Sequence, residues 1–286
     1  MSVVPQQVAA WLQAQGYGEV VRVAPVGGGC INNGARLVTA SGHTFFLKTN
    51  PSAPPDMFAR EAEGLEALRV PDGPRVPRPY LWGQDFLLLE DLAPASRRPD
   101  FWETLGRQLA ALHRHTNPRF GFAHDNYIGS MPQPNPWTED GYAFFAEHRL
   151  LFQARLAHRR GLLPQEDVRR VERLAARLPE LVPPQPASLL HGDLWSGNVI
   201  PDEHGQPALI DPATHYGWAE AELGMTQLFG GFPEAFYRAY EEVRPLMPEW
   251  RERLPIYNLY HLLNHLNLFG ESYYGSVRQI LRRHAP

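Results

Sequence analysis

Residues 191–198 read HGDLWSGN, and a short apolar run after them ends at Asp211. Asp193 supplies a carboxylate two residues after a histidine, and Asn198 supplies an amide five positions later. Phosphoryl transfer needs a carboxylate that orients the attacking hydroxyl and accepts its proton, and oxygen ligands that hold a metal ion against nucleotide phosphates. The pattern predicts Asp193 as the base and Asn198 with Asp211 as magnesium ligands. Ordinary turn chemistry is the alternative explanation of the octapeptide.

A second group of residues, far upstream, favours the same chemistry. Lys48 ends the otherwise apolar segment FFLK. A lysine in an apolar strand is uncommon unless its charge is paired or used. An ammonium there can reach nucleotide phosphates if a glutamate on the next helix holds it in place. Residues 56–69 are predicted to form that helix, with Asp56 as its cap. Glu61 is the preferred partner and Glu63 the fallback, because spacing alone does not separate them. An edge-strand lysine beside a solvated helix is the alternative.

A glycine-bearing turn precedes Lys48. Residues 20–26, 35–39 and 44–49 are predicted strands of an antiparallel sheet, and the turn joins the first two. Main-chain N–H groups of such a turn can approach phosphate oxygens, because glycine has no side chain and tolerates positive φ. The predicted nucleotide-binding residues of the turn are Gly27, Gly28, Gly29, Cys30, Ile31, Asn32 and Asn33. A merely flexible hairpin is the alternative. No Gly-Lys-Ser/Thr ending or helix follows, which argues against a P-loop.

The chain is expected to form two lobes. Residues 71–79 are rich in proline and predicted to be irregular, whereas residues 86–89 form a compact apolar strand. The main chain of the next residues is placed to meet an adenine edge: Glu90, Asp91 and Leu92. We predict an α+β fold with a nucleotide-binding lobe at residues 1–90, made of an antiparallel sheet and one main helix. A larger, mostly helical lobe at residues 91–286 would carry catalysis and acceptor binding, with the nucleotide in the cleft between them.

Helical periodicity dominates the second half of the chain. Helices are predicted from residue 100 to His115, at 142–160, at 164–178 and after Asp211. Residues 120–137 are too rich in Gly, Pro and Asn for a helix or strand, so we read them as a loop that either walls the acceptor site or packs on the surface. His261 and His265 lie four apart, but without a third ligand they are better explained as core or cleft residues than as a metal site.

Composition excludes several classes of protein. With 286 residues, 43% of them hydrophobic, the chain can bury a large core. A net charge of -4 argues against a nucleic-acid partner, and the lack of a long apolar run argues against a membrane span. Cys30 is the single cysteine, so we expect no intrachain disulfide and a cytoplasmic location. The chain would be a monomer, or a dimer linked by oxidised Cys30; a small residue suited to a tight turn is the alternative role of this cysteine.

These residues resemble those of the protein-kinase-like small-molecule kinases, which include aminoglycoside and choline kinases. More narrowly, the chain resembles the fructosamine kinase family, also called ketosamine-3-kinases. The resemblance spans nearly the whole chain and rests on GGGCINN (27–33), FLKTN (46–50), MFAREAEGL (57–65), NYIGSMPQPNPW (126–137), LLHGDLWSGNV (189–199), LIDPA (209–213), LFGGFP (228–233) and LYHLLNHLNLFG (259–270).

The resemblance implies ATP- and Mg²⁺-dependent phosphorylation of the 3-hydroxyl of a ketosamine, free or formed on a protein amine, after which the 3-phosphate adduct falls apart. It also implies that Trp195 stacks against the sugar or its amine-bearing chain and that His265 reaches the acceptor. Unlike in protein kinases, Pro212 and Ala213 follow Asp211, and no activation segment is apparent. Two alternatives stay open: a kinase of another small alcohol, such as an aminoglycoside or choline, and a nucleotide-binding regulator without catalysis.

Overall fold

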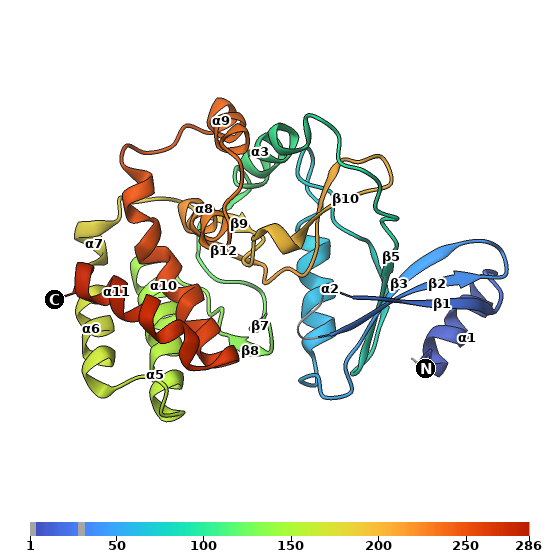
Figure 1. Ribbon diagram of the computed structural model, residues 1–286, viewed down its shortest axis with the longest axis horizontal. Coiled ribbons are helices and arrows are strands. Elements are labelled where there is room, and N and C mark those ends of the chain that lie inside the picture. The colour runs from blue at the N-terminus through green and yellow to red at the C-terminus, as the bar shows by residue number, and fades with distance from the viewer. Residues whose placement is uncertain (1–3, 28–31, 286) are drawn as a thin grey trace.

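A five-stranded antiparallel sheet forms one side of the molecule (Figure 1). The computed structural model describes residues 4–27 and 32–285. In the sheet the strand order is β1-β2-β3-β5-β4. The strands are β1 (Val20–Val26), β2 (Asn33–Thr39), β3 (Thr44–Thr49), β4 (Pro79–Trp82) and β5 (Phe86–Glu90). The antiparallel sheet predicted from the alternating segments is confirmed, and β2 begins two residues earlier than predicted.

Residues 71–78 form no helix or strand, as predicted, but strand β4 begins at Pro79, the last residue of that proline-rich stretch. Pro79 is the first residue of β4, and β4 is an edge strand that pairs only with β5 within the described sheet. A proline is tolerated at this position, because its missing N–H leaves no central ladder bond unmade. The density of prolines therefore concealed a short edge strand.

The two faces of the sheet are covered by different helices, α1 (Gln6–Ala14) and α2 (Met57–Ala67) (Figure 1). Successive side chains of a strand point to opposite faces. Leu88 of β5 accordingly packs in one cluster with α1, and its neighbours Leu87 and Leu89 pack in another with α2. Lys48 lies opposite Leu87 in the register of β3 and β5, which turns the lysine toward α2.

Helices make up most of the rest of the chain and gather on the side away from the sheet (Figure 1). They are α3 (Phe101–Leu112), α4 (Gly141–Phe145), a π-helical segment (Ala146–Leu151), α5 (Phe152–Arg159), α6 (Gln165–Ala176), α7 (Leu178–Leu181), α8 (Ala219–Leu228), α9 (Glu234–Val243), α10 (Trp250–Phe269) and α11 (Tyr274–His284), with short 3-10 turns at Ser196–Asn198 and Glu271–Tyr273. The predicted helices are confirmed, with a π-helical interruption between α4 and α5. Within the described residues, no helix has the length and apolarity needed to cross a membrane.

The long segment at residues 120–137 contains a β-hairpin where we predicted no regular structure. Strands β7 (Asn126–Ile128) and β8 (Met131–Gln133) pair antiparallel, and Ile128 lies opposite Met131. The turn between them has two residues and begins with Gly129 at a φ of 60°. A glycine supplies this conformation without steric cost, so the sequence IGSM carries the hairpin signal that we overlooked.

Short strands bracket the HGDLWSGN stretch. Strand β9 (Ala187–Leu190) lies between β12 (His215–Gly217) and β6 (Thr116–Asn117) and leads into the stretch. Strand β10 (Val199–Pro201) leaves it and pairs with β11 (Pro207–Leu209). Because β11 ends just before Asp211, the β10–β11 hairpin brings Asp211 back beside the stretch.

Candidate functional site

Lys48 lies between two carboxylates that come from distant parts of the chain. Its ammonium donates to Glu61 of α2 and to Asp211. The side chains of Lys48 and Glu61 are only 8% and 9% exposed, whereas that of Asp211 is 42% exposed. Burial alone would lower the pKa of Lys48, but the two carboxylates outweigh it and raise the pKa above its ordinary value. The site therefore holds a permanently charged ammonium.

Glu63, the fallback partner, points elsewhere. Its carboxylate lies 2.9 Å from a guanidinium nitrogen of Arg60 and 2.8 Å from His124 Nδ1. Asp56 is the N-cap residue of α2, as predicted, but its side chain makes no capping hydrogen bond. Its carboxylate accepts instead from the hydroxyl of Tyr127 (2.7 Å) and from Arg60 Nε (3.0 Å). The carboxylate of Asp56 is thus used by Tyr127 and by Arg60 of α2 and not by the first main-chain N–H groups of the helix.

Asp193 sits at a tight turn of the HGDLWSGN stretch. Gly192 before it has a φ of 87°, and a Cβ there would meet the Ala213 carbonyl oxygen at 2.1 Å, so only glycine fits. Asn198 Nδ2 donates to the Asp193 carbonyl oxygen (2.8 Å), with Asp193 Oδ2 at 3.4 Å. Burial, helped by the charge of Asp211, raises the pKa of Asp193 to about 7. A carboxyl group tuned in this way is suited to proton transfer near neutral pH.

Hydrogen bonds hold the HGDLWSGN stretch beside the segment that carries Asp211. The N–H of Ile210 donates to the Asn198 carbonyl (3.1 Å), and the N–H of Ala213 donates to the His191 carbonyl (2.8 Å). His191 Nε2 donates to the Ile210 carbonyl (2.9 Å). Asp211 itself has a left-handed φ of 58°, which is uncommon for a residue with a side chain. The strained turn fixes its carboxylate toward Lys48.

The residues predicted to bind metal have the right atoms for a hard cation. The amide nitrogen of Asn198 is used by Asp193, which leaves its amide oxygen for a ligand. Asp211 adds carboxylate oxygens that are partly exposed. The described residues contain no cluster of three or more His, Cys, Asp or Glu side chains able to hold a metal by themselves. This donor set fits Mg²⁺, which uses one or two protein oxygens and completes its octahedron with water and phosphate.

The predicted nucleotide-binding residues are only partly described. Gly28, Gly29, Cys30 and Ile31 lie outside the described residues. Gly27 follows the end of β1, and Asn32 accepts from Asn50 Nδ2 (3.1 Å) just after β3. Asn33 begins β2 opposite Thr49, so this end of the sheet also carries Lys48.

The residues predicted to meet adenine lie at the end of β5, whose last residue is Glu90. The carboxylate of Glu90 accepts from Arg75 (2.6 Å), and that of Asp91 pairs with Arg36 (2.7 Å). Leu92 is buried. All three side chains are therefore occupied within the protein. The main-chain N–H of Glu90 donates to the Arg78 carbonyl (2.8 Å), so the main chain of Asp91 and Leu92 is better placed to contact a ligand.

Glu222 of α8 supports the HGDLWSGN stretch, a role that was not predicted from the sequence. Its buried carboxylate accepts from the main-chain N–H groups of His191 (3.0 Å) and Gly192 (2.6 Å) and lies 2.9 Å from His113 Nε2. Burial opposes ionisation, but these donors hold the pKa of Glu222 below its ordinary value. A glutamate in an amphipathic helix gives no local sign of such partners, which lie some 30 residues or more away.

We expect Glu222→Gln to lower the free energy of unfolding by about 2 kcal/mol and kcat by about 3- to 10-fold, because one N–H donor of the stretch then faces an NH₂ group. Glu220→Gln is the matched control, since Glu220 is a buried carboxylate of the same helix that accepts from Arg253 Nε (2.6 Å). It should cost stability without changing kcat by more than about twofold. Urea unfolding and steady-state rates measure both. Equal rates in the two variants would contradict the role given to Glu222.

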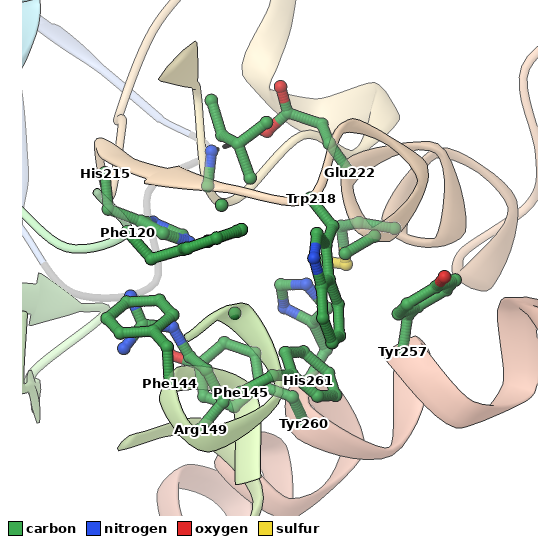
Figure 2. A pocket seen from close by; sticks show the side chains of 16 residues that line it. Phe120, Phe144, Phe145, Arg149, His215, Trp218, Glu222, Tyr257, Tyr260 and His261 are labelled. Carbon is green, nitrogen blue, oxygen red and sulfur yellow. Dashed lines mark hydrogen bonds between the residues drawn. The ribbon is translucent and has the colours of Figure 1, made fainter. Parts of the chain in front are cut away.

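A cavity of about 30 Å³, shown in Figure 2, is lined in part by Gly192 of the HGDLWSGN stretch. Figure 2 shows Phe120, Phe144 and Trp218 around it, with Glu222 above. His261, which we predicted to be a core or cleft residue, lines the cavity, is buried and has no partner for Nδ1. The cavity is too small for a nucleotide. Burial lowers the pKa of His261 to about 3, so this imidazole stays neutral in the folded protein.

The low pKa of His261 predicts a loss of stability in mild acid. The unfolded chain binds a proton near pH 6.5 and the folded chain does not, so stability is complete above that pH and falls below it. We expect His261→Leu to reduce the loss between about pH 7.5 and pH 5 by about 2 kcal/mol, measured by urea unfolding. His204→Leu is the control, because its side chain is 74% exposed. An equal loss in wild type and His261→Leu would sink this explanation.

Trp195 and His265, predicted separately to contact the acceptor, belong to one row of aromatic rings. Trp195 meets Phe229 edge-on at 6.4 Å, and Phe229 lies 4.7 Å from His265. Beyond His265 follow Tyr273 at 5.1 Å and Phe269 at 5.4 Å from its ring. Phe269 is 48% exposed. The row thus runs from Trp195 of the HGDLWSGN stretch to the partly exposed Phe269. Phe229, Phe269 and Tyr273 were not predicted as members, because only the fold brings Phe229 and Tyr273 beside His265.

Comparison with known proteins extends over the whole chain. The family described as fructosamine kinase matches residues 4–285. A protein of Synechocystis named probable ketoamine kinase is 43% identical over 98% of this chain and 96% of its own length. A chloroplastic protein-ribulosamine 3-kinase of Oryza sativa is 39% identical over 96% of this chain and 82% of its own.

Solved structures show the same fold. A crystal structure from Thermobifida fusca, assigned as a fructosamine-3-kinase, superposes with a TM-score of 0.88 at 36% identity and covers 98% of both chains. A choline kinase of Streptococcus pneumoniae gives a TM-score of 0.66 at 15% identity, over 97% of this chain and 98% of its own, which shows the fold alone. The expected protein-kinase-like α+β fold is confirmed. Together with the full-length match, these similarities show that the chain belongs to the fructosamine kinase family.

Proposed function

We propose that this chain is an ATP-dependent kinase that phosphorylates the 3-hydroxyl of ketosamines. The observation that carries the proposal is the buried ammonium of Lys48 between Glu61 and Asp211, beside the stretch with Asp193 and Asn198. Burying an ammonium with two carboxylates costs desolvation free energy, so such a group is weak evidence for a purely stabilising role. Binding of nucleotide phosphates is a function that requires a cation of this kind. The family relationship makes a ketosamine the acceptor.

In this proposal the nucleotide lies between two lobes, residues 1–90 and residues 91–286. Lys48 binds its phosphates, and Glu61 keeps the ammonium in position. The turn from Gly27 to Asn33 covers the phosphates, and the main chain at Glu90, Asp91 and Leu92 contacts adenine. Support comes from the register of the sheet, because Gly34, next to this turn, pairs directly with Lys48.

Asn198 and Asp211 would hold the divalent metal, which we propose to be Mg²⁺. When bound, this ion neutralises negative charge that develops on the phosphates. Asp211 would then contact both the ion and Lys48. The left-handed backbone conformation of Asp211 orients its carboxylate toward Lys48.

Asp193 orients the 3-hydroxyl and takes its proton as the hydroxyl oxygen forms a bond to the γ-phosphorus. The bond from the γ-phosphorus to the bridging oxygen breaks at the same time, and ADP leaves with the bonding electron pair. The raised pKa of Asp193, about 7, supports this role, since the carboxylate is basic enough to accept the proton near neutral pH.

The row of aromatic rings is the proposed binding surface for the rest of the acceptor. Trp195 would stack against the sugar, and Phe229 and His265 would face its amine, which is a cation near neutral pH. The Nδ1–H of His265 donates to the His261 carbonyl (2.8 Å), and a lowered pKa keeps the ring neutral. Nε2 is therefore a free acceptor for an ammonium N–H.

The composition of this row favours a ketosamine over an aminoglycoside. An aminoglycoside carries several ammonium groups and calls for an acidic acceptor surface, whereas the row next to Asp193 is aromatic. The exposed end at Phe269 leaves room for an amine that belongs to a protein. The 3-phosphate of a ketosamine is unstable and releases the amine, so the reaction would repair glycated amines, either free or on proteins.

Comparison of acceptors tests the proposal. Purified protein is incubated with ATP, Mg²⁺ and ribulosyl-lysine, fructosyl-lysine, choline or an aminoglycoside, and ADP release is followed. We expect turnover on at least one ketosamine and none on the other two compounds. Turnover only on choline or the aminoglycoside would replace the proposal by another small-alcohol kinase, and Mg·ATP binding without turnover on any acceptor would favour a regulator.

The cytoplasmic location and the oligomeric state stay predictions. A monomer, or a dimer linked through oxidised Cys30, is compatible with the proposal. Cys30 lies outside the described residues. Its place in the phosphate-covering turn is the reason to expect that oxidation alters nucleotide binding.

A further inference from the structure

The hairpin β7–β8 lies between α2 and the helical side of the molecule (Figure 1). Its Tyr127 hydroxyl donates to Asp56 Oδ1 at the start of α2, at 2.7 Å. Just before the hairpin, His124 Nδ1 lies 2.8 Å from Glu63 Oε1 in the middle of the same helix. The hairpin therefore contacts α2 at two points on either side of Glu61.

The other side of the hairpin is tied to the segment that follows Asp211. Asn126 Nδ2 donates to the Thr214 carbonyl (2.7 Å), and Gln133 Nε2 donates to the Ala213 carbonyl (3.0 Å). Gln133 Nε2 also donates to Asn126 Oδ1 (2.8 Å). Asn126 and Gln133 are both buried, so these bonds lie in a low dielectric and are costly to break.

A buried arginine anchors this amide network to the helices. Arg149, in the π-helical segment, is 1% exposed and donates to Asn135 Oδ1 (2.7 Å) and to the Pro134 carbonyl (2.7 Å). Asn135 Nδ2 in turn donates to Asn126 Oδ1 (3.0 Å). Among the described residues no carboxylate pairs with this guanidinium, which is unusual for a buried arginine, and its N–H groups hold the loop through carbonyl and amide oxygens instead.

The helix α2 also packs directly on the segment after Asp211. A Cβ at Gly64 would meet Thr214 Oγ1 at 2.8 Å, so glycine is what allows the close approach. Glu61 on α2 and Asp211 on the segment are the two carboxylates of Lys48. The hairpin and the Gly64 contact thus bridge the two elements whose separation decides whether Lys48 meets both partners.

We propose that the β7–β8 hairpin is a strut that sets the distance from Glu61 to Asp211, with Tyr127 and His124 as positioning residues for Lys48. The inference rests on the proposed kinase function. It replaces the acceptor-site wall that was one of two sequence-based readings of residues 120–137. It also gives α2 contacts of its own, through Tyr127 and His124, where protein kinases use a phosphorylated loop.

Tyr127→Phe tests the strut, since it removes one hydroxyl and keeps the ring. We expect Kd for Mg·ADP and KM for ATP to rise by about 3- to 10-fold, while KM for the acceptor stays within about twofold. Hydrogen exchange of residues 57–67 in the free protein should become faster. Tyr274→Phe is the matched control, because the Tyr274 hydroxyl donates to Asp167 Oδ2 (2.7 Å) between α11 and α6, away from Lys48. It should change none of these quantities.

A second variant changes the position of α2 without altering the hairpin. Gly64→Ala favours the helix locally but pushes it from Thr214, so it should also weaken Mg·ADP binding selectively. A rise in acceptor KM in Tyr127→Phe would restore the acceptor-wall reading and overturn the strut. Unchanged nucleotide affinity in both variants would overturn it as well. Mg·ADP binding is measured without an acceptor, so failure of the ketosamine assay alone would refute the proposed function and leave the strut testable.

Discussion

Replacing Asp193 with asparagine is expected to lower kcat by roughly 100- to 10,000-fold. The substitution keeps the shape of the side chain and removes its ability to accept the proton of the attacking hydroxyl. Asn198 Nδ2 donates to the main-chain carbonyl of residue 193, so the turn should stay intact. Single-turnover kinetics on the best ketosamine measures the chemical step directly.

Nucleotide binding and the free energy of unfolding are the two controls for the Asp193→Asn experiment. Binding of Mg·ADP should change by no more than about threefold, because Asp193 contacts the acceptor and not the nucleotide in this account. The free energy of unfolding should not fall, since the raised pKa of Asp193 means that its ionised form is disfavoured in the fold. A variant that turns over within about tenfold of wild type would remove Asp193 from the role of base.

Lys48→Met is expected to lower kcat/KM for ATP by roughly 100- to 1,000-fold, because the phosphates lose a preorganised cation in a buried site. It should also destabilise the fold by about 3 kcal/mol, since Glu61 is left buried without its partner. Both effects are accessible from the same preparation, by steady-state kinetics and by urea unfolding.

The double variant Lys48→Met with Glu61→Gln separates the two effects. Neutralising Glu61 should recover most of the lost stability, because no unpaired charge is left in the interior. Activity should stay at the level of Lys48→Met. If the double variant regained activity, the ammonium would have only a structural purpose, contrary to the nucleotide site proposed around it.

Local sequence patterns were enough to predict much of the fold. Alternating apolar residues predicted the sheet, and the charge of Lys48 in an apolar strand marked a site before any contact was known. The strand register then turned Lys48 toward α2. Helix spacing placed Glu61 and Glu63 on the same helix but could not choose between them, because that choice depends on which face α2 turns toward the sheet, and this is set by packing against distant segments.

What the sequence did not reveal depends on long-range contacts. Glu222 acts on main-chain groups of another segment, and nothing around it in the chain distinguishes it from a helix-surface glutamate. Tyr127 likewise gains its meaning only from Asp56, a residue of another element. The hairpin at residues 126–133 was the exception, since a two-residue glycine turn was visible in the sequence and the surrounding prolines outweighed it in our reading.

The most direct test of the central claim is to identify the product formed from ATP and ribulosyl-lysine or fructosyl-lysine. Phosphorus NMR and mass spectrometry of the reaction should show one phosphate on the 3-oxygen of the sugar, followed by its loss and release of free lysine. The Asp193→Asn protein should show neither species in the same time. ATP left intact with every ketosamine, or a phosphate found at another oxygen, would contradict the account.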